Sequence, residues 1–212
     1  MDDVLTADAA PDMSVDRKPV FNELLQNGID KRDSEMIALA LKNGAEPNIL
    51  LFAGITYKQS RWERLRSRNA GLGEGWVRLA LEHGADAEAT KLYRDERPWP
   101  AIHWAQAYFL PAVMDMLITS GAKIDTPSPD GRTPLMDAVK NGFVEEIEYY
   151  LGKGANPLYL SPDGNCALND LRHSKMFGRD EKERLVKLMM QHSIPERGGS
   201  ENTSAPGKRF SI

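Results

Sequence analysis

The 212-residue sequence has little cysteine, no long hydrophobic run and no excess of positive charge, and each shortage excludes a class of protein. The single cysteine, Cys166, excludes an internal disulfide and a cysteine-ligated zinc site, and it fits a reducing compartment. No apolar stretch reaches the roughly 18 residues that a membrane span needs. Lysine plus arginine (27) are outnumbered by aspartate plus glutamate (31), which gives a net charge of −4. This balance lacks the excess of positive charge that is typical of proteins that bind nucleic acid.

The N-terminus lacks the features of a secretory signal, which needs a basic start and an apolar middle. Residues 1–16 carry five aspartates and neither lysine nor arginine, so they are predicted to form an acidic tail. Residues 195–212 are rich in glycine, serine and proline and are predicted to be a disordered tail. Between the tails, the hydrophobic content of 41% is enough for a sizeable core, and we expect a cytoplasmic protein.

Glycine and proline recur at regular positions, and the clearest repeated unit spans residues 130–157. Asp130-Gly131 is a turn dipeptide, Thr133 suits a helix N-cap, and Pro134 suits the first helical position, where its missing N–H costs nothing. Gly142 and Gly154 are placed to end two helices in the left-handed conformation. Between these signals, apolar residues have helical spacing: Leu135, Ala138 and Val139 in the first helix, and Ile147, Tyr150 and Leu151 in the second.

The same unit recurs 33 residues earlier and, in part, 33 residues later. Second helices align along most of the chain on the residue that ends them, which is glycine in four cases and Ser193 in the fifth. Their apolar triplets are Ile37/Ala40/Leu41, Val77/Ala80/Leu81, Met114/Leu117/Ile118, Ile147/Tyr150/Leu151 and Val186/Met189/Met190. A helix pair this small cannot bury its own apolar face, so neighbouring pairs are expected to stack.

These motifs resemble the ankyrin repeat family. The resemblance rests on Thr133-Pro134-Leu135 with Ala138, and on the Gly-Ala-x-x-Asn/Asp ends at residues 44–48 and 121–125. It implies an all-α solenoid of about five helix–turn–helix repeats, with loops projecting as fingers beside a concave helical face. The repeat domain is predicted at residues 17–194, with units at about 17–48, 49–90, 97–127, 130–160 and 163–194.

Three parts of the chain depart from this pattern. The first unit is predicted to carry a longer loop between its helices, at residues 29–34. The second unit has no Thr-Pro-Leu, and its first helix is either residues 57–69, which we favour because Trp62 and Leu65 suit a buried pair, or residues 49–56. The glycine-rich stretch 71–75 is expected to be a flexible connector, and Pro100 replaces the capping Thr133 in the third unit.

A basic run in the second unit is the first candidate for a binding function. Arg61, Arg64 and Arg68 fall on one face if this stretch is helical, and they suit an acidic partner surface. The alternative is a solvated helix face, because runs of surface charge are commonly just that.

The second candidate is a cluster of aromatic residues in the third unit. The family pattern puts Trp99 and Tyr108 on the finger and the concave face, where large aromatic side chains are typical of binding hot spots. The alternative is that both pack against the insertion in the second unit. Trp104 and Phe109 are expected in or near the core, since Phe109 takes the place of Gly142.

The third candidate is the set of positions at which ankyrin proteins usually vary to choose their partners. By analogy these positions form one stripe across the concave side, although any single one is also compatible with an ordinary exposed residue. The predicted partner-binding stripe comprises Arg97, Trp99, Tyr108, Asp130, Arg132, Lys140, Asn141, Asp163, Asn165 and His173.

No motif for catalysis is present. None of the four histidines has metal-ligand spacing from another histidine, cysteine or carboxylate pair, and no nucleophile elbow or nucleotide fingerprint occurs. His103 resembles the family histidine that orders a turn by hydrogen bonding, and Cys166 aligns with Thr133 as a small cap substitute. We therefore predict no enzyme activity, no cofactor and no metal.

The function predicted from the sequence is a non-catalytic module that binds and regulates or inhibits another protein, as an immunity-type inhibitor or a regulatory adaptor. No nucleic acid, membrane or small-molecule substrate is expected as a partner. Two alternatives stay open: an effector delivered into another cell to act on a host protein, and an enzyme with an unrecognised site.

Overall fold

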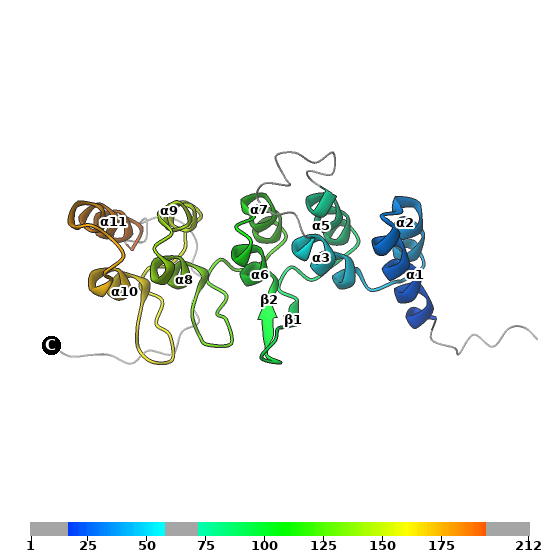
Figure 1. Cartoon of the computed structure of the whole chain (residues 1–212), viewed down its shortest axis with the longest axis horizontal. Helices are drawn as coiled ribbons and strands as arrows, with labels where there is room; N and C mark the ends of the chain where they lie inside the picture. The colour runs from blue at the N-terminus through cyan, green and yellow to red at the C-terminus, as the bar shows by residue number, and fades with distance from the viewer. Residues whose placement is uncertain (1–16, 58–71, 194–212) are drawn as a thin grey trace, which may run out of the picture. The chain divides into compact units, whose positions relative to one another are not determined.

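The computed structural model describes residues 17–57 and 72–193, and these form ten helices and one two-stranded hairpin (Figure 1). The chain divides between Pro134 and Leu135 into two compact units, each described by itself. The first holds α1 (Lys18–Lys31), α2 (Ser34–Lys42), α3 (Pro47–Thr56), α5 (Leu72–Glu82), β1 (Thr90–Leu92), β2 (Pro98–Pro100), α6 (Ala101–Ala107) and α7 (Pro111–Thr119). The second holds α8 (Pro134–Asn141), α9 (Val144–Gly152), α10 (Ala167–His173) and α11 (Arg179–His192). The fold is mostly helical, as predicted, and the short hairpin was not predicted.

Consecutive helices pack as pairs. In the first unit α1 packs on α2, α3 on α5 and α6 on α7, while α3 also contacts α1 and α6. In the second unit α10 packs on α11, and α11 also contacts α9. The core therefore lies between one pair and the next as well as within each pair, because a single pair cannot cover its own apolar face.

The segment with the clearest repeat signal forms the predicted helix–turn–helix in α8 and α9. All six apolar residues predicted for its core are fully buried: Leu135, Ala138, Val139, Ile147, Tyr150 and Leu151. Gly142 follows α8 with φ of +75°, and the next backbone N–H, from Phe143, donates to the Ala138 carbonyl at 3.0 Å. Burial raises the pKa of the Tyr150 hydroxyl far above its ordinary value.

The predicted glycine ends are confirmed in both units. Gly121 and Gly154 take φ of +105° and +85°, a region that favours glycine because it has no Cβ. The alanine after each glycine donates its N–H back across the last turn, from Ala122 to the Leu117 carbonyl and from Ala155 to the Tyr150 carbonyl. Gly44 and Gly84 end α2 and α5 in the same way. Ser193, which replaces the glycine after α11, stays in the right-handed region.

The long loop predicted between the first two helices is wrong. Helix α1 continues to Lys31 and buries Ile29, because Ile29 lies one turn beyond the buried Leu25 on the same face. Only Arg32 and Asp33 separate the helices. The Asp33 carboxylate caps α2 by accepting the backbone N–H groups of Glu35 and Met36 at 3.0 and 3.1 Å.

The first helix of the second pair is α3, so the less favoured alternative, residues 49–56, is the one observed. Helix α3 packs on α5 and buries Leu50, Leu51 and Ile55. Apart from Tyr57, the favoured stretch lies outside the described residues. The predicted flexible connector is also wrong from Leu72 onward, since α5 begins there. A Cβ added to Gly54 of α3 would lie 2.6 Å from the Gly73 carbonyl oxygen of α5. The two glycines therefore allow α3 and α5 to approach each other very closely.

The predicted burial of the second helix of the last pair is confirmed at Met189 and wrong at Met190. Leu185 and Met189 are fully buried in α11, whereas Met190 is 52% exposed. Helix α11 begins at Arg179. It packs against α9 and α10 through a different set of residues from the one inferred by alignment. Lys182 donates from Nζ to the Ser174 carbonyl oxygen at 2.6 Å, which places a cation at the C-terminus of α10.

Candidate protein-binding surface

An antiparallel hairpin between α5 and α6 forms the finger of the third helix pair. Strands β1 and β2 pair Lys91 with Trp99 and Leu92 with Pro98. At its tip, the Tyr93 N–H donates to the Arg97 carbonyl at 3.1 Å, and Glu96 takes a left-handed φ of 57°. The finger thus carries Trp99 on the strand that returns to α6. Pro100 precedes α6 in extended conformation as its N-cap and provides no side-chain cap hydrogen bond.

Ion pairs hold the tip of this hairpin. The Arg97 guanidinium contacts the Asp95 carboxylate at 2.6 Å and the Asp130 carboxylate, from the next finger, at 2.5 Å. Desolvation works against ionisation of Asp95, but hydrogen bonds from the Arg97 backbone and side chain and from Trp99 hold its pKa below the ordinary value. The Asp130 and Asp95 carboxylates raise the pKa of Arg97. The structure therefore brings together two residues of the predicted stripe, Arg97 and Asp130, as partners of each other.

An aromatic pocket of about 400 Å³ opens between the hairpin and α6. The Tyr93 ring meets the Trp99 ring at 6.2 Å and the Trp104 ring at 5.3 Å between centroids, both edge to face. Trp99 is half-buried and Tyr108 is 47% exposed at the C-terminal end of α6. The residues that line the pocket are Tyr93, Trp99, His103, Trp104, Ala107 and Tyr108. Both predicted aromatic residues therefore border one concavity, and Trp99 also packs against Tyr93 of the same hairpin.

His103 joins this pocket to the following finger. Its ring is 4% exposed and lies 5.8 Å from the Trp99 ring, edge to face. Its Nε2 is hydrogen-bonded to the Thr126 carbonyl oxygen at 2.8 Å. This confirms the predicted role of His103 in ordering a turn. Phe109 follows with φ of 44°, in the left-handed position that Gly142 occupies after α8.

We expect His103→Phe to lower the free energy of unfolding by about 1–3 kcal/mol, because the Thr126 carbonyl would lose its buried donor. His173→Phe is a matched control: the His173 ring makes the same kind of bond to the Asn169 carbonyl, but in an exposed setting. Urea denaturation of both variants tests this. Equal losses of stability would show that burial of the bond has no special importance.

The remaining residues of the predicted stripe are divided between the two units. Arg132 lies in the second finger, where the Ser128 N–H donates to its carbonyl at 2.8 Å. Lys140 and Asn141 are exposed at the end of α8, and His173 is exposed at the end of α10. Asp163 and Asn165 occupy the last finger, which repeats the same turn from Ser161 to Asn165. The single stripe stays a prediction, and Arg61, Arg64 and Arg68 lie outside the described residues, as do the predicted tails.

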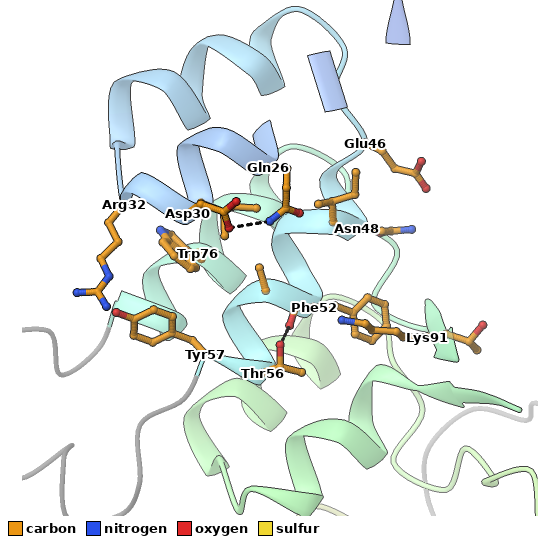
Figure 2. Close-up of a pocket in the computed structure, with 14 residues that line it drawn as sticks. Gln26, Asp30, Arg32, Glu46, Asn48, Phe52, Thr56, Tyr57, Trp76 and Lys91 are labelled. Atoms are coloured by element: carbon orange, nitrogen blue, oxygen red, sulfur yellow. Dashed lines mark hydrogen bonds between the residues drawn. The ribbon is translucent and has the colours of Figure 1, made fainter. Parts of the chain in front are cut away.

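A second, larger pocket of about 840 Å³ was not foreseen from the sequence (Figure 2). It lies over α1 and α3 and is bounded by the hairpin and α5. Its charged and polar lining comes from Gln26, Asp30, Arg32, Glu46, Asn48, Thr56 and Lys91, and its apolar lining includes Ile49, Phe52, Ala53, Tyr57 and Trp76. We call it the α1–α3 groove. Its residues are scattered between positions 26 and 91, so no local motif marks it.

No group of three or more histidine, cysteine, aspartate or glutamate side chains in residues 17–57 and 72–193 is arranged to hold a metal ion. Over the same residues, every helix is too short or too polar to span a membrane.

Residues 130–161 match the family model of the ankyrin repeat. The chain contains an ankyrin repeat. The match covers α8 and α9, the segments whose predicted core and turns the structure confirms, and only part of the finger on either side. Ankyrin repeats are general protein–protein interaction modules.

One curated protein with similarity to this chain is calmodulin-binding transcription activator 4 of Arabidopsis thaliana, which is 29% identical over 131 residues. The aligned stretch covers 58% of this chain and 12% of that protein. The chain therefore spans about one eighth of the length of this relative, which is similar in one part only.

Proposed function

We propose that this chain is a protein-binding module of about five ankyrin-type repeats, at residues 17–194, that regulates or inhibits its partner without catalysis. Five helix pairs support the number of repeats: α1/α2, α3/α5, α6/α7, α8/α9 and α10/α11. Four of them end in the same glycine turn. The proposed action is stoichiometric, as in an immunity-type inhibitor or a regulatory adaptor, and the proposed site of action is the cytoplasm.

The observation that carries this proposal is the aromatic pocket beside the hairpin. It combines five aromatic or imidazole rings with an exposed edge, on a finger whose tip is held by Asp95, Arg97 and Asp130. Rigid aromatic side chains around a preformed concavity give contact area at low entropic cost, which is typical of binding hot spots. A partner side chain inserted between Trp99 and Tyr108 would bury both residues further.

The test is capture of the partner by immobilised full-length protein from a lysate of the organism that encodes it, with identification by mass spectrometry. We expect Trp99→Ala combined with Tyr108→Ala to reduce the captured partner about thirtyfold, the effect of losing roughly 2 kcal/mol at a hot spot. Partner recovery is then measured again with each purified variant.

Phe143→Ala is the matched control, because Phe143 is an aromatic residue of similar exposure (51%) outside the pocket. It should capture as much partner as the unaltered chain. Circular dichroism on heating checks that the double variant still folds, since Trp99 contacts Tyr93 and His103 and its removal costs some stability. Undiminished capture by a folded double variant would contradict the role of the pocket.

A further inference from the structure

Two cations line the α1–α3 groove, and each is held by aromatic rings. The Arg32 guanidinium, at the C-terminal end of α1, lies over the Tyr57 ring with 5.6 Å between its carbon and the ring centroid. The Tyr57 ring is itself fixed by Trp76 of α5, edge to face at 5.0 Å. Trp76 is buried, so the ends of α1 and α3 together with α5 build a rigid support for this one guanidinium. A guanidinium stacked on a ring keeps its N–H edges available for a carboxylate.

Lys91 of β1 has the matching arrangement on the hairpin side of the groove. Its Nζ lies 5.8 Å from the centroid of the buried Phe52 ring and 5.9 Å from that of Trp104. Two rings from α3 and α6 thus position one ammonium group, which reduces the entropy lost when it binds an anion. Figure 2 shows Arg32 with Tyr57 at one side of the groove and Lys91 with Phe52 at the other.

Neither cation is paired with a carboxylate of the described residues. The two acidic side chains of the groove have other partners: Asp30 accepts a hydrogen bond from the Gln26 amide at 3.0 Å, and Glu46 lies 3.9 Å from the Lys18 ammonium. Among the described residues that line the groove, Arg32 and Lys91 are therefore the cations without a paired carboxylate. An anionic ligand that contacted both cations would neutralise their charge.

The two carboxylates that line the groove indicate which anion fits. A nucleic acid carries charge at every phosphate, and Asp30 and Glu46 would repel part of that continuous charge. A peptide carries its carboxylates at separate positions, and its backbone N–H groups would find acceptors in Asp30, Gln26 and Asn48. Ile49 and Ala53 also line the groove and offer apolar surface for a small side chain.

We propose that the α1–α3 groove binds an acidic peptide segment of the partner, with one carboxylate on Arg32, a second on Lys91 and an apolar side chain between them. This inference rests on the proposed function, protein binding, and adds the chemistry of the segment that is bound. The net charge of −4 repels acidic peptides in general, so binding has to come from these two local cations.

The test uses fluorescence polarisation of the full-length protein with fluorescein-labelled peptides that carry two glutamates separated by roughly two to six alanine or leucine residues. We expect one spacing to bind at least tenfold more tightly than its glutamine counterpart, with affinity that falls as salt is added. Equal affinity for the glutamine series would overturn the proposal. So would tighter binding of an oligothymidine probe, which would indicate a nucleic-acid site.

Variants of the cations locate the binding. Arg32→Glu and Lys91→Glu should each weaken the best peptide about tenfold, whereas Arg32→Lys should weaken it less, because its charge is kept. Arg94→Glu is the matched control: Arg94 is an exposed cation in the turn of the same hairpin, does not line the groove, and its replacement changes the net charge equally. The double variant, Arg32→Glu with Lys91→Glu, should bind the corresponding dilysine peptide instead.

Loss of binding in Arg94→Glu as large as in Lys91→Glu would overturn the assignment to the groove. The two proposals fail separately. If a partner is captured through Trp99 and Tyr108 but no diglutamate peptide binds, the acidic-segment inference alone is wrong. If no partner is captured and no peptide binds, protein binding itself is contradicted.

Discussion

Replacing Leu135 by alanine is expected to lower the free energy of unfolding by about 2–5 kcal/mol, the range for large-to-small changes in a closed core. Leu135 is fully buried in α8, together with Ala138 and Val139 of the same helix. Removal of its isobutyl group loses burial of apolar surface and leaves a cavity that α8 and α9 cannot easily close. Urea denaturation followed by circular dichroism measures the loss.

Leu158→Ala is the control for this substitution. Leu158 is 45% exposed in the last finger of the same unit, so its truncation should change stability by less than about 0.5 kcal/mol. Because each repeat is stabilised mainly by its neighbours, faster hydrogen exchange in the Leu135→Ala variant should also reach the helices beside α8. A loss of less than about 1 kcal/mol would mean that α8 contributes little to the core.

Two glycines near the contact of α3 and α5 are expected to respond in opposite directions to the same substitution. A Cβ on Gly54 would lie 2.6 Å from the Gly73 carbonyl oxygen and 2.9 Å from the Val77 backbone nitrogen. Because backbone atoms cannot move aside without separating the helices, Gly54→Ala should destabilise the protein by about 1–3 kcal/mol or more. Thermal unfolding of the purified variant measures this loss.

Gly75 is the matched position, because it lies in α5 itself and has no atom within 4 Å of an added Cβ. Gly75→Ala is expected to raise stability by about 0.5–1 kcal/mol, since alanine loses less backbone freedom than glycine in a helix. The two variants have the same chemical change, so a shift in the same direction for both would show that helix propensity outweighs the close contact. The contact would then not limit the packing of α3 on α5.

The local signals in the sequence were sufficient where each one acts within a single turn of helix. Thr133-Pro134, Gly142 and Gly154 mark helix boundaries through their own backbone preferences, and those boundaries are observed. The spacing of Leu135, Ala138 and Val139 likewise predicted which face of α8 is buried. Such signals depend on residues a few positions apart, so they can be recognised without knowledge of the rest of the fold.

Prediction failed where burial depends on more than one neighbour. Helix α3 contacts α1, α5 and α6, so it is apolar on most faces and shows no helical period that would distinguish it from a loop or a strand. Ile29 was assigned to a loop because its burial comes from α1 running one turn further than the repeat pattern suggests. Met190 was assigned to the core by alignment, although the start of α11 at Arg179 turns it outward.

One candidate binding surface was indicated by the sequence, whereas the other depends on contacts between residues far apart in the chain. Trp99 and Tyr108 were selected from the sequence because the resemblance to ankyrin repeats puts them on the finger and the concave face. Arg32, Tyr57 and Lys91 were not, because a cation on an aromatic ring involves residues far apart in the chain and has no sequence period. The turn-ordering role of His103 was foreseen only through the resemblance to a family, and its partner, Thr126, was not.

By itself, the sequence determined the helical repeat, the turns that end its helices and the core of the clearest unit, because these follow from backbone preferences and the 3.6-residue period. The tertiary structure alone decided that α3 is the partner of α5, that a hairpin closes an aromatic pocket over α6, and that Arg32 and Lys91 are held on aromatic rings in one groove. Those features arise from contacts between separate helices, and the energy of such a contact depends on a distance in space that no local pattern of residues encodes.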